Sequence, residues 1–330
     1  MDPGFEINDG ETFACLAFKN YCPMPIAGPD PVHLGDGNWL SKSLPFPLNE
    51  RCRGQLGKHA AQELERANLV LVAKRVPSVP DVPPTDANID VRRVTYLHYG
   101  LAVWACIPKY QDAILLLGGH DDGGVGVVEG ERQYLFHGSC EAAKNAAVVL
   151  APMERLEAAV DFAVRLEGIN AAHEADYKTG AKPPKFWRVI SGVTAFLDAC
   201  RSYRYEVRMH QYVRAIESFL PPSVSGAKSF AEKASLLCTP KNALEEMYRL
   251  RNKAEHHEYF EDAKLCGGKP EDAARSRVSQ AEALCVELYR RLFTKNADFL
   301  RLYETGASIE NFWSNDSLVR KQWGEPFVLQ

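Results

Sequence analysis

The spacing of hydrophobic residues changes character partway along the chain. In the first part, short runs of β-branched and aromatic residues alternate with stretches rich in Pro and Gly, a pattern typical of strands joined by turns. A Gly-rich piece at 118–126 favours a hairpin or a wide loop, and one helix is predicted near 57–67. The predicted strand segments are 69–72, 91–107, 113–117, 125–128 and 134–137.

Beyond residue 150, apolar residues recur three and four positions apart, which predicts amphipathic helices packed as an antiparallel bundle. The polar segment 172–184 is predicted to be a loop, and 277–303 the longest helix. The predicted helices are 153–166, 186–200, 209–220, 229–237, 242–260 and 277–303.

We therefore predict an α+β protein with a strand-rich domain at 1–150, an all-α helical bundle at 151–304 and a C-terminal tail at 305–330. The tail has low periodicity and contains Trp313, Trp323 and Phe327. These aromatic residues are expected to dock on the bundle or on a second subunit.

Composition narrows the class of protein. The nine cysteines form no Cys-x-x-Cys pair and no Cys/His cluster at zinc-ligand spacing, which predicts reduced thiols and no structural metal. No run approaches the roughly 20 apolar residues of a membrane helix, and no secretion signal is seen, so we expect a cytoplasmic protein with no membrane contact.

The charges of the second half of the chain nearly balance, since residues 151–330 hold 26 Lys and Arg against 25 Asp and Glu. Affinity for nucleic acid must therefore come from local patches.

One such patch is predicted at Arg201, Arg204 and Arg208, which are spaced three and four apart and interleaved with Tyr203 and Tyr205. Cations that follow a phosphate backbone, with aromatic rings on which bases stack, are typical of RNA-binding surfaces. The alternative is a helix face that contacts only water, which is what most charged stripes do.

The segment most suggestive of chemistry is 243–260, ALEEMYRLRNKAEHHEYF. On a helix, Leu244, Met247, Tyr248 and Ala254 define a buried stripe with Arg251 at its centre. Burying a cation costs free energy unless it is paired or functional. In a structural interpretation Arg251 pairs with Glu255, four residues on, and ties helices together.

In a functional interpretation the same helix carries a reactive set. Asn252 and His256 are four residues apart and share a face next to that of Arg251. Together the three residues offer a cation for a phosphate, an orienting amide and a group that exchanges protons near neutral pH. RNA transesterification needs a base for the 2'-hydroxyl, a cation for the phosphorane and an acid for the leaving oxygen, and it needs no metal.

The bare Arg–His spacing is weak evidence, because Arg93/His98 and Arg132/His137 repeat it. Those two copies lie in segments predicted to be strands. The copy at Arg251 differs in its helical setting and in the Asn that follows the arginine.

The run Arg251-Asn252-x-x-x-His256 resembles the signature of the HEPN superfamily, in which an Arg, an adjacent polar residue and a His form a ribonuclease site. Three segments in order resemble helices of ApeA-like HEPN proteins of bacterial defence systems, over about residues 185–303. The resemblance does not reach residues 1–150. The three segments are HQYVRAIESFLPP at 210–222, KSFAEKASLL at 228–237 and EEMYRLRNKAEHH at 245–257.

The resemblance implies a metal-independent endoribonuclease that needs no cofactor and leaves 2',3'-cyclic phosphate ends. It would act in anti-phage defence, as in abortive infection, or as the toxin of a toxin–antitoxin system. Its partners would be RNA and a second copy of the chain, with a composite site between two bundles. A trigger or an antitoxin protein would bind the N-terminal domain. The implied catalytic residues are Arg251, Asn252 and His256, with supporting roles for Arg214, Glu217, Glu255 and His257.

Three interpretations stay open at this point. The bundle could cleave RNA, or it could be a HEPN module that binds RNA, a nucleotide or a protein partner without cutting. In the third, Arg251 is a core ion pair of an adaptor protein. The sequence also leaves open whether His256 or His257 faces the site.

Overall fold

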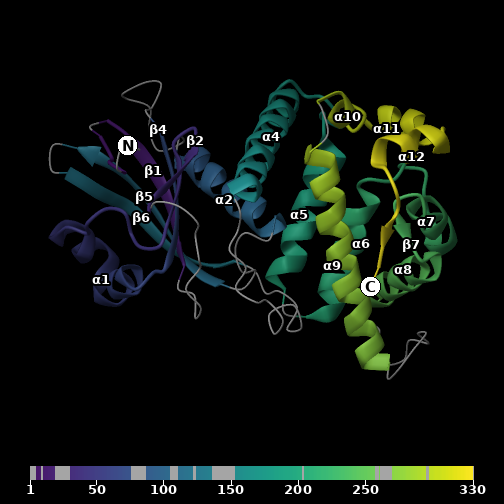
Figure 1. Ribbon diagram of the computed structural model, residues 1–330, viewed down its shortest axis with the longest axis horizontal. Helices are drawn as coiled ribbons and strands as arrows, with labels where there is room; N and C mark the ends of the chain where they lie inside the picture. The colour runs from purple at the N-terminus through teal and green to yellow at the C-terminus, as the bar shows by residue number, and fades with distance from the viewer. Residues whose placement is uncertain are drawn as a thin grey trace. The chain divides into compact units, whose positions relative to one another are not determined.

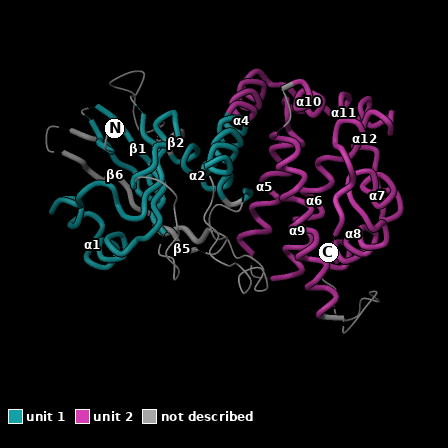
Figure 2. Tube along the Cα trace, viewed as in Figure 1, with its two compact units in different colours: residues 1–167 teal, residues 168–330 magenta. Residues whose placement is uncertain are grey.

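The computed structural model of the protein divides into two compact units, Met1–Glu167 and Gly168–Gln330 (Figure 2). Helix α4 (Met153–Lys178) contributes residues to both units. The first unit holds an antiparallel sheet and the second is mostly helical, so the predicted α+β class is confirmed. The residues described are 5–8, 10–18, 30–75, 87–104, 111–121, 124–135, 153–202, 204–256, 260, 270–294 and 297–329.

The sheet of the first unit has the strand order β2-β3-β4-β1-β5-β6, with every neighbouring pair antiparallel (Figure 1). Strand β1 lies between β4 and β5 and is buried along almost its whole length, because both of its faces are covered. The hairpin expected in the Gly-rich piece is formed by β5 and β6, which stay paired as far as Asp121 and Gly124. The strands are β1 (Thr12–Phe18), β2 (Val32–Gly35), β3 (Asn38–Ser41), β4 (Leu69–Arg75), β5 (Gln111–Asp121) and β6 (Gly124–Leu135).

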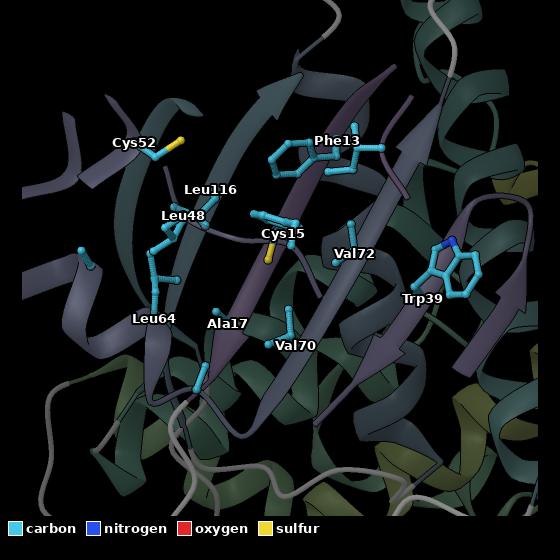
Figure 3. Packing of buried hydrophobic residues seen from close by; sticks show 14 residues of the cluster. Phe13, Cys15, Ala17, Trp39, Leu48, Cys52, Leu64, Val70, Val72 and Leu116 are labelled. Carbon is cyan, nitrogen blue, oxygen red and sulfur yellow. The ribbon is translucent and has the colours of Figure 1, made fainter. Parts of the chain in front are cut away.

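One face of this sheet is closed by a hydrophobic cluster with helix α1 (Glu50–Glu65) (Figure 3). Alternate residues of a strand point to the same face, so Phe13, Cys15 and Ala17 of β1 enter the cluster together. The helix predicted near 57–67 begins earlier, at Glu50, because the Asn49 side chain accepts a hydrogen bond from the Cys52 amide and caps its first turn. The other labelled members of the cluster are Trp39, Leu48, Cys52, Leu64, Val70, Val72 and Leu116.

The strand predicted at 91–107 was wrong, because residues up to Val103 belong to helix α2 (Ala87–Val103). The β-branched and aromatic residues there indicated a strand, but Val94, Leu97 and Leu101 are three and four apart and fully buried. Helix α2 packs on β1, β4 and β5, and this burial outweighs the modest strand propensity.

Helix α2 also contains one of the other two copies of the Arg–His spacing. Arg93 and His98 also lie on a helix, so a helical setting does not distinguish Arg251 from them. What still distinguishes it is the Asn252 that follows. Arg132 lies in β6, and His137 is outside the described residues.

In the second unit, helix α6 packs directly on α5, α8 and α9. The apolar stripes expected here are confirmed, since Met209, Val213 and Ile216 of α6 are fully buried. The helices are α5 (Trp187–Arg201), α6 (Tyr205–Glu217), α7 (Gly226–Ala234), α8 (Lys241–Glu255), α9 (Pro270–Thr294), α10 (Ala297–Arg301), α11 (Gly306–Trp313) and α12 (Asp316–Trp323).

Three predicted boundaries in this unit were wrong. Residues 172–178 continue α4, because Ala, Glu and Lys are good helix formers and the polar character of the segment reflects solvent exposure. Helix α4, with 26 residues, is longer than α9 with 25. The helix predicted over 277–303 is divided between α9 and α10, and α8 ends at Glu255 rather than near 260.

The segment after residue 304 forms α11, α12 and strand β8 (Phe327–Val328), which pairs in parallel with β7 (Cys238–Thr239). Of the three aromatic residues predicted to dock, Trp313 and Trp323 are buried and Phe327 is partly buried. The Trp323 indole donates to the Tyr303 hydroxyl at 3.1 Å, and that hydroxyl donates to the Phe219 carbonyl at 3.3 Å. The segment thus anchors the end of α6. Among the described helices, none combines the length and apolar character needed to cross a membrane.

The contact between α5 and the end of α6 depends on Gly192. A Cβ added at this position would lie 2.1 Å from the Ser218 Oγ and 2.6 Å from its Cβ. We expect Gly192→Ala to destabilise the fold by about 1–3 kcal/mol, as overpacked sites do. Thermal unfolding followed by circular dichroism measures the change.

Gly168→Ala is the matched control, because a Cβ at this α4 position meets no heavy atom within 4 Å. Replacing an unconstrained helical glycine stabilises by about 0.4–1 kcal/mol. Equal melting temperatures for the two variants would contradict the close approach of α5 to α6.

Candidate functional site

The side chain of Arg251, on α8, contacts side chains of both α8 and α6. Its Nη1 donates to the Glu255 carboxylate at 2.6 Å and to the Asn252 Oδ1 at 3.1 Å. Its Nη2 lies 3.9 Å from the Glu217 carboxylate of α6. The guanidinium carbon is 5.4 Å from the centre of the Tyr248 ring, a cation–π distance. Acidic groups from two helices therefore surround one cation.

The helix places Arg251 less deeply than the sequence predicted. Leu244, Met247 and Tyr248 are buried as expected, but Ala254 is only partly buried. The Arg251 side chain is 18% exposed, so it lies at the margin of the apolar stripe rather than at its centre. Its Nε is buried and has no hydrogen-bond partner among the described residues. Arg251 is thus both tethered and accessible from one side.

Glu217 contributes a carboxyl with an altered proton affinity. Burial raises its pKa above the ordinary value, and the nearby cations Arg251, Arg188 and Arg214 only partly offset this. Arg188 of α5 donates to the Glu217 carbonyl at 2.5 Å and to the Leu220 carbonyl at 3.1 Å, so it binds the turn that follows α6. A carboxyl with a raised pKa beside arginines is a candidate group for proton exchange.

His210 is a member of the site that the sequence analysis missed. It lies on α6, one turn before Arg214 and two turns before Glu217, and its Nδ1 is buried with no hydrogen-bond partner in the described part of the chain. Burial and the charges of Arg251 and Arg214 lower its pKa, so the ring is neutral at neutral pH. The signal was present, because positions 210, 214 and 217 share one helix face.

Two further candidates, His256 after α8 and Arg214 on α6, are exposed. His256 is the C-cap residue, its amide donates to the Asn252 carbonyl at 3.0 Å, and its side chain is exposed. Arg214 is also exposed. The structure thus brings Asn252, Glu255 and Glu217 within 4 Å of Arg251, and His256 follows at the C-cap of α8. His257 is outside the described residues.

The predicted RNA-tracking face at Arg201, Arg204 and Arg208 was wrong. Arg201 ends α5 and Arg204 is the N-cap residue of α6, so the chain turns between them and no single helix face carries all three. Arg208 is buried and donates to the Glu282 carboxylate of α9 at 2.8 Å. Tyr203 is outside the described residues, and the Tyr205 ring is contacted by Arg275.

In the described ranges, no group of three His, Cys, Asp or Glu side chains is placed to hold a metal ion.

No family model matches the chain, and it matches no curated protein and no solved structure.

The buried pair of Arg208 and Glu282 gives a stability prediction. Removing one partner leaves an uncompensated charge in the core, so Arg208→Ala should destabilise by about 3–5 kcal/mol. The double variant Arg208→Met, Glu282→Leu should recover most of that loss, because no buried charge remains. Urea unfolding of the full chain measures both.

Arg204→Ala serves as the control, because Arg204 is exposed and lies 3.8 Å from Glu206. Its effect should stay within about 0.5 kcal/mol, as for most surface substitutions. An Arg208→Ala protein as stable as wild type would rule out a structural role for the pair.

Proposed function

We propose that the protein is a metal-independent endoribonuclease of the HEPN type, which cleaves RNA by attack of the 2'-hydroxyl and leaves 2',3'-cyclic phosphate ends. The observation that carries the proposal is the setting of Arg251. A partly exposed guanidinium lies between two helices, with Asn252 hydrogen-bonded to it and His256 as the C-cap residue of the same helix. This is the residue set of the motif that resembles the HEPN signature.

Arg251 supplies the positive charge for the reacting phosphate. A guanidinium binds carboxylate and phosphate through the same pair of N–H donors. Glu255 is 46% exposed, and an ion pair this open contributes about 0–1 kcal/mol, so a phosphate oxygen can replace its carboxylate. The proposed substrate thus displaces a weak internal ligand.

His256 supplies proton transfer at an accessible position. One base removes the proton from the ribose 2'-hydroxyl as its oxygen attacks phosphorus, and one acid protonates the departing 5'-oxygen. In a homodimer with a composite site, the His256 of a second copy provides the second of these groups. The proposal places this chemistry in the cytoplasm, in anti-phage defence or as a toxin, with the N-terminal unit binding a trigger or an antitoxin protein.

A single set of variants tests cleavage. Purified protein is incubated with RNA in excess chelator, and we expect cleavage by the wild type and a loss of at least about 100-fold in rate for Arg251→Ala and for His256→Ala. Arg249→Ala is the matched control, since Arg249 lies on the same helix and pairs with Glu245 four residues earlier, as Arg251 pairs with Glu255. It should cleave at the wild-type rate.

Melting temperatures of the same proteins separate cleavage from the structural interpretation. The two carboxylates around Arg251 favour the alternative that it is only an ion pair between helices. In that case Arg251→Ala would melt well below Arg249→Ala, and no RNA would be cut by any of the proteins. Full cleavage by Arg251→Ala and His256→Ala would refute the proposed site. Binding of RNA without turnover would favour a non-catalytic HEPN module.

A further inference from the structure

Two large aromatic side chains of the second unit are exposed close to the start of α5. Trp187 is 51% exposed and Tyr177, in the last turn of α4, is 72% exposed. The Trp187 ring stacks on the His173 ring, with centroids 5.7 Å apart and planes 19° apart. Tyr177 lies one turn beyond His173 on the same face of α4. We call Trp187, His173 and Tyr177 the aromatic platform.

The aromatic platform is fixed by backbone contacts. The His173 Nδ1 is 2.9 Å from the Lys185 carbonyl oxygen, and the Lys185 amide donates to the Asp176 carboxylate at 3.1 Å. The Phe186 amide donates to the Glu304 carbonyl at 2.8 Å. Phe186 itself is buried, so the chain turns its neighbour Trp187 outward at the first position of α5. The exposed indole is therefore preorganised rather than a loose surface side chain.

Three lysines lie close in sequence to the residues of the aromatic platform. Lys178, Lys182 and Lys185 are exposed, and Lys185 is paired with Glu304 at 2.7 Å. Glu174 and Asp176 lie on the same turns of α4, so the cations are local and do not form a broad positive field. Exposed rings with exposed lysines close by in the sequence suit a ligand with flat bases and a charged backbone.

We propose that the aromatic platform binds single-stranded RNA, with nucleobases stacking on Trp187 and Tyr177 and phosphates reaching Lys178 and Lys182. The proposal takes its ligand class from the proposed ribonuclease function but does not require cleavage. Base stacking on aromatic side chains is tolerant of sequence, so the aromatic platform would hold a strand without selecting a site.

A protein partner fits this surface less well. Stable protein interfaces bury about 800 Å² on each side, whereas two exposed rings offer about 150–250 Å² each even when fully covered. Lysine is depleted at the cores of such interfaces, yet lysines stand at 178, 182 and 185, between and beside the platform residues in the sequence. Charge and size therefore favour RNA over a second copy of the chain.

The test uses the full chain and a fluorescent 12-nucleotide oligoadenosine in which every 2'-oxygen is methylated, so that it cannot be cut. Anisotropy at moderate salt gives the Kd. We expect Trp187→Ala to weaken binding about tenfold and Tyr177→Ala several-fold, whereas Trp187→Phe keeps most of the affinity. The matched control is Val328→Ala, an exposed apolar position of the same unit, which should not change the Kd.

Salt dependence tests the lysines independently. For single strands, each phosphate contact contributes about 0.7 to the slope of log K against log salt, so Lys178→Gln with Lys182→Gln should reduce the slope by about 1.4. If Trp187→Ala binds the oligomer with the same Kd as the wild type, or if the wild type does not bind the oligomer, the proposal is overturned. So would a loss of self-association in Trp187→Ala with RNA affinity intact, which would assign the surface to a second copy.

The two proposals fail in different ways. If the ribonuclease proposal alone is wrong, no RNA is cut but binding of the methylated oligomer still depends on Trp187. If the aromatic platform alone is wrong, Trp187→Ala cleaves RNA with an unchanged KM.

Discussion

Burial of charge around helix α6 is the constraint on which the helical unit depends. Arg208 on one face of α6 is sealed against Glu282 of α9, and Glu217 on another approaches Arg251 of α8. Removing such groups from water costs several kcal/mol per ion unless the partner is in place. The Arg208–Glu282 pair is the sealed one of the two, and it holds α6 against α9. The close contact of Gly192 with Ser218 then fixes α5.

The two arginines paired across α6 differ in a way that bears on function. Arg208 and Glu282 are both almost completely inaccessible, with side-chain exposures of 3% and 4%. Arg251 keeps 18% exposure and shares its charge among Glu217, Glu255 and Asn252. A sealed pair can only stabilise the fold, whereas an open and weakly paired guanidinium can exchange a carboxylate for a phosphate. The buried Arg208–Glu282 pair thus stabilises the packing of the helices, and Arg251 on α8 is the accessible cation.

Periodicity alone predicted most of the helical unit, because amphipathic helices such as α5 and α6 carry their burial pattern in the spacing of apolar residues. It failed for α2, where β-branched residues suited a strand but the sheet beneath buried them as a helix. It also extended a loop into α4, since a polar segment that faces solvent looks like a connection.

For the site, the sequence identified Arg251 and Glu255 because they lie four residues apart on one helix, and it reached Glu217 on α6 only through the resemblance to HEPN helices. It missed His210 although positions 210, 214 and 217 share one face of α6, and the Arg251 charge that lowers the pKa of His210 reaches it only after α6 and α8 pack. It misplaced Arg208 for the converse reason, since the carboxylate that compensates its burial is 74 residues away. Charge pairing across helices is a tertiary property that spacing along one helix does not reveal.

The most direct measurement of the central claim is the mass of the RNA ends that the purified protein produces in the presence of excess chelator. Attack by the 2'-oxygen leaves a 2',3'-cyclic phosphate on one fragment and a 5'-hydroxyl on the other, and that is the predicted result. Fragments with 3'-hydroxyl and 5'-phosphate ends, or activity that requires an added divalent cation, would contradict it.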